Sequence, residues 1–95
     1  MGLAPMPRFF FDVLDGREVR RDPEGEEFAD LDAALIEAIA SARYLVAQGL
    51  LRNEDVSGRC FLIRDENEQT VTIVPFRNTL PGTLGVWSAH AAPPG

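Results

Sequence analysis

The chain has 95 residues, of which 45% are apolar and 25% charged, a balance typical of one small globular domain. Fifteen acidic and nine basic residues give a net charge of −6, which disfavours binding to a nucleic-acid backbone. The single cysteine, Cys60, excludes an internal disulfide and a multi-cysteine metal site. The sequence shows no signal-peptide pattern and no uninterrupted apolar run of bilayer length. It therefore predicts a cytoplasmic protein with no membrane partner.

The opening stretch MPRFFFDVLDG, residues 6–16, predicts a first strand that is apolar on both of its faces. Strand alternation places Phe9 and Phe11 on one face, and Phe10 and Leu14 on the other. A sheet with one face in water should alternate between apolar and polar residues. The second face of this strand is therefore expected to be covered.

Turn signals place the next elements. The pair Asp15-Gly16 favours a tight hairpin turn, and a short return strand is expected over residues 17–21. The run DPEG at residues 22–25 then predicts a second turn, because proline presets φ and glycine adds freedom.

A helix over residues 31–51 is the clearest predicted element, with Asp30 as its N-cap. Its main apolar stripe follows helical spacing from Leu31 to Leu50. A second apolar arc has the same spacing: Ile36, Ala40, Tyr44, Ala47 and Leu51. Two interpretations of this arc stay open, a set of exposed helix-forming residues or a contact surface.

Two more strands are predicted over residues 59–65 and 69–76. Asn67, between them, suits the left-handed position of a hairpin turn, and Pro75 suggests an edge or the end of a strand. The order β-β-α-β-β predicts an α+β fold in which one helix packs on a four-stranded, mostly antiparallel sheet.

The predicted domain covers residues 6–80, after a leader at residues 1–5. The last segment, residues 81–95, is rich in Gly, Pro and Ala and is expected to be a tail. Three apolar residues of the tail are candidates to cover the second sheet face: Leu84, Val86 and Trp87.

A second subunit is the other candidate cover, so the sequence predicts self-association. The candidate interface residues come from the second sheet face and the helix arc. They are Phe10, Leu14, Ile36, Tyr44, Val74 and Phe76. If Phe10 belongs to an interface, Phe10→Glu should dissociate the oligomer without unfolding the chain.

No residue pattern indicates catalysis, a cofactor or a metal. Cys60 lies in an apolar strand, which favours a small core residue over a nucleophile, and His90 lies in the predicted tail. The acidic residues between Asp22 and Glu37 lack the spacing of a calcium loop and are expected to be solvated. The chain is therefore interpreted as non-enzymatic.

Arg17, Arg20 and Arg21 gather on the predicted first hairpin. They are candidate contacts for an anionic partner. The favoured alternative is that they pair with the acidic loop of the same chain.

Several stretches resemble a family of short, uncharacterised bacterial proteins classed as a domain of unknown function. They are MPRFFFDVLDG, RDPEGEEFADLDAA, SAR at residues 41–43, and IRDENEQTVTIVPFRNTL. The resemblance covers residues 6–77 and implies a small α+β domain without an established activity.

The leading functional hypothesis is a non-enzymatic binding or assembly module that forms a homodimer. The first alternative is an antitoxin-like regulator associated with nucleic acid through the hairpin arginines. The second alternative is a small ligand carrier or enzyme, which requires a concave pocket with convergent polar groups.

Overall fold

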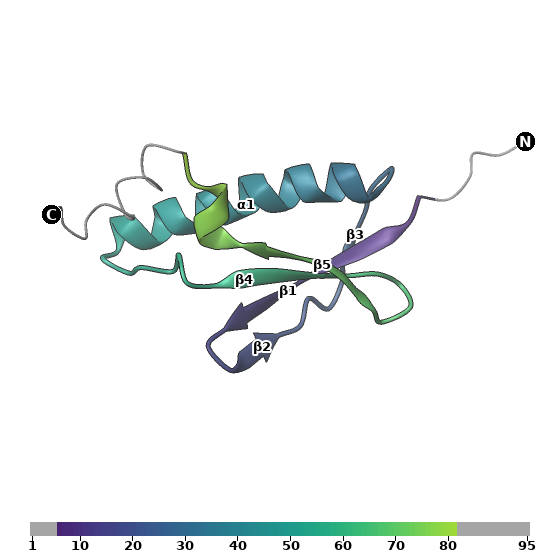
Figure 1. The fold of residues 1–95 in the computed structure, drawn as a ribbon, viewed down its shortest axis with the longest axis horizontal. Helices are drawn as coiled ribbons and strands as arrows, with labels where there is room; N and C mark the ends of the chain where they lie inside the picture. Colours follow the sequence, from purple (N-terminus) through teal and green to yellow (C-terminus); the bar gives the residue numbers. More distant parts are fainter. Residues whose placement is uncertain (1–5, 82–95) are drawn as a thin grey trace, which may run out of the picture.

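One long helix lies across one face of an antiparallel sheet in residues 6–81, the part of the chain that this computed structural model describes (Figure 1). The predicted α+β fold is confirmed. In chain order, its elements are β1 (Arg8–Asp15), β2 (Glu18–Arg20), β3 (Glu26–Glu27), α1 (Leu31–Leu51), β4 (Cys60–Arg64), β5 (Thr70–Pro75) and the 3₁₀ helix η1 (Phe76–Thr79).

The four main strands lie in the order β2-β1-β4-β5, and all neighbours are antiparallel. The short strand β3 pairs with the first residues of β1, so β2 and β3 share one edge of the sheet. The sequence predicted a turn but no strand there, because two residues carry no periodic signal. Among the described residues, β5 alone forms the other edge.

Capping and glycine placement explain the limits of α1. Its N-cap is Asp30, whose Oδ1 accepts the N–H of Ala33 at 2.9 Å. Near its other end, a Cβ on Gly49 would lie 2.6 Å from the carbonyl oxygen of Glu54, and Asn53 turns the chain with φ +60. By length and composition alone α1 could cross a bilayer, a test that core helices of soluble proteins also pass.

Small helix residues meet large aromatic residues in the core. Ala34, Ala38 and Ala42 follow the i, i+4, i+8 row of α1 and are completely buried. They leave room for Phe61 of β4 and Phe76 of η1, whose ring centroids lie 4.8 Å apart. The helix side of the sheet is thus a closed hydrophobic core.

The structure corrects the face assigned to Val74 and Phe76. Val74 lies opposite Phe61 on the helix side, and both Val74 and Phe76 are buried in the core. Both sets of alternating residues in β5 contain apolar side chains, so the sequence did not determine which set faces the helix. Ile73 occupies the outer face instead. The tail candidates, Trp87 among them, and His90 lie outside the described residues.

Candidate functional site: the open face of the sheet

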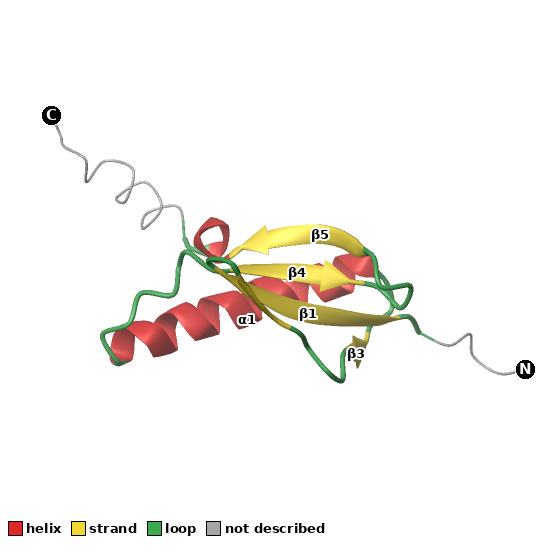
Figure 2. Ribbon diagram, turned by 90° about the horizontal axis from the view of Figure 1, so that it is seen from below, coloured by secondary structure: helices red, strands yellow, loops and turns green. Residues whose placement is uncertain are grey.

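The face of the sheet turned away from α1 carries no second layer within residues 6–81 (Figure 2). Its apolar side chains come from the four main strands and are called here the open-face patch. The patch consists of Leu14, Val19, Cys60, Leu62 and Ile73, which the strand register places on this face, together with the exposed Val71 at the irregularity of β5.

Exposure of the open-face patch increases towards the edges of the sheet. The members on β1 and β4 are half-buried between neighbouring strands. The members on the outer strands are exposed: Val19 of β2 by 47%, and Val71 and Ile73 of β5 by 42% and 55%. The apolar surface available to a partner therefore lies mostly along the two edges.

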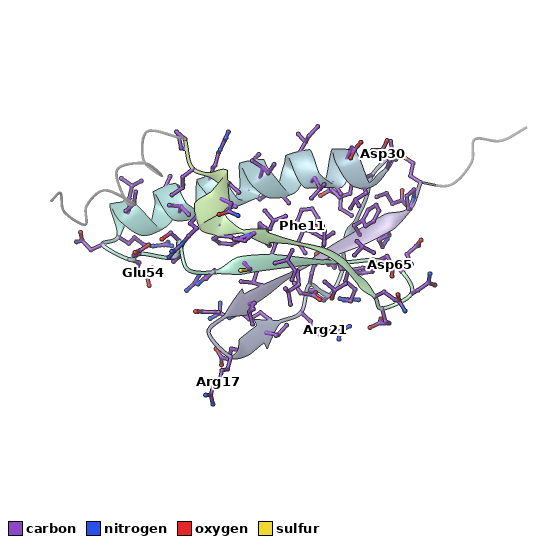
Figure 3. All side chains as sticks on the ribbon, viewed as in Figure 1. Phe11, Arg17, Arg21, Asp30, Glu54 and Asp65 are labelled. Carbon is purple, nitrogen blue, oxygen red and sulfur yellow. The ribbon has the colours of Figure 1, made fainter. Side chains whose placement is uncertain are left out.

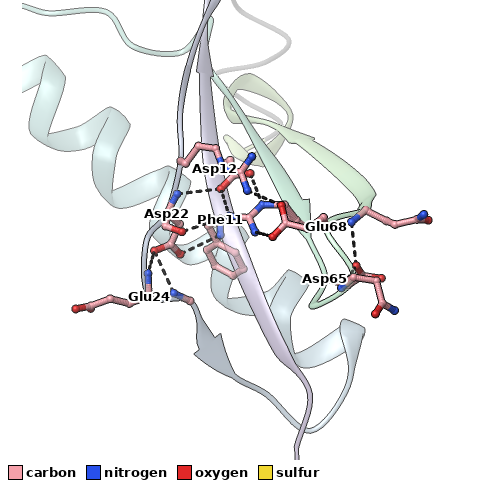
Figure 4. Close-up of polar contacts among 11 residues, drawn as sticks. Phe11, Asp12, Asp22, Glu24, Asp65 and Glu68 are labelled. Carbon is pink, nitrogen blue, oxygen red and sulfur yellow. Dashed lines mark hydrogen bonds and ion pairs between the residues drawn. The ribbon is translucent and has the colours of Figure 1, made fainter.

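An ion pair is buried on the same face. Nε of Arg64 donates to Oδ2 of Asp12 at 2.8 Å, and Nη2 donates to Oδ1 at 3.1 Å (Figure 4). Asp12 is only 4% exposed and Arg64 only 6%. The ring of Phe10 lies over the guanidinium, with its centroid 4.4 Å from Cζ. The bidentate pair ties β1 to β4, and Phe10 serves as its cover.

The segment between β2 and β3 adds Asp22 to the ion pair. The residues Asp12, Asp22, Arg64 and Glu68 are called here the polar cluster. The carboxylate of Asp22 accepts the N–H of Phe11 at 3.0 Å, and those of Glu24 and Gly25 at 3.2 Å each. The N–H of Asp22 donates to Oδ1 of Asp12 at 2.9 Å. The side chain of Asp22 thus accepts the backbone N–H of Phe11, which lies on the part of the β1 edge that pairs with neither β2 nor β3.

The β4–β5 turn adds Glu68 to the cluster. Glu68 takes the left-handed conformation with φ +64, where the sequence predicted Asn67. Its carboxylate accepts Nη2 of Arg21 at 2.7 Å and Nη1 of Arg64 at 3.4 Å. Oδ1 of Asp65 accepts two backbone N–H groups of the turn and fixes its shape.

These contacts shift the pKa values of two carboxyl groups downward. Burial raises the pKa of Asp12. The hydrogen bonds from Arg64 and from the N–H of Asp22, together with the nearby charge of Arg64, lower this pKa by more than burial raises it. The net pKa of Asp12 therefore lies below its usual value. The hydrogen bond and charge of Arg21 lower the pKa of Glu68.

We expect the protein to lose stability in acid, with Asp12 as one cause. A carboxyl group with a lowered folded-state pKa stabilises the fold above its unfolded pKa of about 4, and this contribution is lost as the pH falls through the folded value. Asp12→Asn should thus be less stable than the wild type at pH 7, and the difference should shrink at pH 3. Urea unfolding at both pH values measures it. An undiminished difference would contradict this role of Asp12.

The hairpin arginines do not form one surface. Arg17 projects from the tip of the β1–β2 hairpin, away from Arg21 (Figure 3). Arg20 lies opposite Val13 and so shares the helix side of the sheet, whereas Arg21 pairs with Glu68. Thus Arg21 contacts the β4–β5 turn, and not the acidic loop that the sequence favoured as its partner.

The remaining interface candidates lie on the helix arc. Ile36 and Tyr44 are 71% and 63% exposed on the side of α1 away from the sheet. Beside them lies an open groove of about 470 Å³, lined by Glu37, Ala40, Ser41, Tyr44 and Leu45. The hydroxyl of Ser41 donates to Glu37, so the polar groups of the groove are partly paired.

The structure also shows where the candidate nucleophile Cys60 and the possible metal-binding side chains lie. Cys60 is a free thiol, half-buried in the open-face patch. Within residues 6–81, no group of three or more His, Cys, Asp or Glu side chains is placed to hold a metal ion.

The buried pair was not predicted from the sequence, although one signal for it exists. Asp12 and Arg64 are ionisable residues inside otherwise apolar strands. Such residues are rarely buried unless they are paired, so each indicates a partner of opposite charge.

Across residues 6–81, the fold and this face define the class: a small α+β domain with one α-helix, whose sheet has no second layer on one side. The chain belongs to the family described as Domain of unknown function (DUF6894), whose model matches residues 8–77. The matched segment contains the whole polar cluster and the open-face patch. No match was found among curated proteins or among solved structures.

Proposed function

We propose that this domain is a non-enzymatic assembly module that forms a homodimer through the open-face patch. The observation that supports this proposal is the exposure of Val19, Val71 and Ile73 on a sheet face without a second layer in residues 6–81. Covering such side chains contributes about 25 cal/mol for each Å² of apolar surface removed from water.

The charge distribution makes the open face the part of the described surface where a second copy meets the least repulsion. The chain carries a net charge of −6, so two copies repel each other across most of their surfaces. Within the open face, the central charges Asp12 and Arg64 neutralise each other and are buried. Two copies can therefore meet there without bringing unpaired like charges together.

We expect the full-length protein to be a dimer, and Val71→Glu to shift it to a monomer. The new carboxylate would be desolvated inside an apolar contact, so the dissociation constant of the dimer should increase at least tenfold. Light scattering on a sizing column, over a range of protein concentrations, measures the mass.

Tyr44→Glu is the matched control, because it adds the same charge at an exposed aromatic residue of the helix arc. It should leave the dimer intact. Loss of the dimer with Tyr44→Glu, but not with Val71→Glu, would place the interface on α1. A wild-type monomer at every concentration would overturn the proposal.

A further inference from the structure

We propose that two copies pair edge to edge through β5, which joins their sheets into one continuous antiparallel sheet. This inference rests on the proposed homodimer and names its geometry. The strand β5 forms one edge of the sheet by itself, with no described element beyond it (Figure 2).

The two edges of the sheet differ in how they resist pairing. The edge opposite β5 consists of a three-residue and a two-residue strand that carry Glu18, Arg20, Glu26 and Glu27. Short strands and charged side chains are the usual protection of an edge. On β5, by contrast, no ionisable residue occurs from Gln69 to Phe76, and Thr70–Val74 are all β-branched. The strand β5 lacks this charge protection, and its only edge-protecting features are Pro75 at its end and the irregularity near its start.

The backbone of β5 indicates which groups face the free edge. The N–H of Phe76 donates to the carbonyl of Arg59, which continues the β4–β5 ladder. Alternation from this bond points the polar backbone groups of Val74 and Thr72 towards β4, and those of Ile73 and Pro75 outward. Pro75 thus stands where its missing N–H costs no ladder bond.

This pattern selects a register for a pair related by a two-fold axis. With Ile73 opposite its own copy, each Ile73 N–H meets the Ile73 carbonyl of the other chain. The carbonyl of Pro75, which has no N–H to offer, then lies opposite Val71 of the copy. Antiparallel pairing of identical strands gives a closed dimer and leaves no free β5 edge.

The same register covers the exposed members of the open-face patch on β5, whereas Val19 at the opposite edge stays outside the contact. These members on β5 are Val71 and Ile73. Side chains directly opposite each other across an antiparallel pair have Cβ atoms about 5 Å apart, so the two Ile73 side chains would touch. A five-residue strand pair is a small interface, and we expect the dimer to dissociate on dilution.

A charge exchange at residue 73 tests this register on the full chain. Ile73→Lys and Ile73→Glu should each be monomeric, because each places like charges opposite each other. A one-to-one mixture of the two variants should form a heterodimer, detected by light scattering and native mass spectrometry. Val19→Lys and Val19→Glu, at the opposite edge, should each remain homodimers.

A second pair of variants tests the backbone contact. Ile73→Pro removes an outward N–H without removing a bond to β4, whereas Ile73→Thr keeps both the N–H and the β-branch. The dissociation constant should rise at least tenfold more for proline than for threonine, with the helical circular dichroism retained. If Ile73→Pro does not fold, the charge exchange decides alone.

The outcomes separate this inference from the proposed function. If the Lys and Glu variants at residue 73 do not combine, or the dimer is lost through Val19 variants instead, edge pairing is overturned while self-association stands. A wild-type chain that is monomeric at all concentrations overturns both.

Discussion

Replacing Arg64 with methionine is expected to lower the free energy of unfolding by about 3 kcal/mol, because the carboxylate of Asp12 would stay buried without its cation. This value lies at the low end of the range for breaking a buried ion pair. We expect the low end because the Asp12–Arg64 pair is covered by the ring of Phe10 and by nearby polar groups. Small domains unfold with about 5–15 kcal/mol in total, so the loss is a large share. Urea denaturation at pH 7 and fixed protein concentration measures it.

A double-mutant cycle provides the control. Asp12→Asn leaves the buried guanidinium of Arg64 with only the longer ion pair to Glu68, at 3.4 Å, so it should also be strongly destabilising. The double variant removes both charges and should cost clearly less than the sum of the two single changes. Arg64→Lys should cost an intermediate amount, because an ammonium cannot reproduce the bidentate geometry. Additive effects would show that the two side chains do not act as a pair.

The helix and the strands could be predicted because their signals are local. Asp30 and the spacing of apolar residues defined α1 over residues 31–51, as observed. The first hairpin was predicted one residue early: Asp15 pairs with Glu18, so Gly16 and Arg17 form the turn. A single glycine with φ +65 is enough for that turn, and the sequence does not reveal which of its neighbours joins the strand.

Which side of each strand faces the helix was harder to predict, because both faces of β1, β4 and β5 are apolar. An irregularity in the pairing with β4 also changes which residues of β5 face the helix. Ile63 lies opposite Thr72, but Arg64 lies opposite Thr70. An extra residue of this kind has no sequence signature of its own. The open face consequently presents Ile73, and not Val74.

The polar cluster could not be predicted, because its members are distant in the sequence. Asp12 and Arg64 are separated by 52 positions and meet only through the β1–β4 register. Their pairing explains why Phe10 points away from the helix: its ring covers a buried charge of the same chain. Phe10→Glu therefore tests this cover as well as the interface, and variants of Val71 and Ile73 test the interface more directly.

Gly25→Ala is expected to destabilise the fold by about 2–4 kcal/mol, because two costs add at this residue. Gly25 has φ +65, a left-handed conformation that costs about 1–2 kcal/mol for a residue with a Cβ. That Cβ would also lie 2.7 Å from the Phe10 ring and 2.8 Å from the carbonyl oxygen of Phe9. The ring lies over Arg64, and β3 pairing holds Phe9, so neither contact can relax without disturbing a neighbour.

Gly16→Ala separates the two costs, since Gly16 has the same φ of +65 but no atom within 4 Å of an added Cβ. It should cost about 1–2 kcal/mol, the conformational cost alone. The excess for Gly25→Ala then measures the packing of the 21–25 segment against the Phe10 ring and the Phe9 carbonyl, and Phe10→Leu in the Gly25→Ala background should recover the part due to the ring. Equal losses at Gly16 and Gly25 would mean that Phe10 moves aside freely and that its position over Arg64 contributes little to the fold.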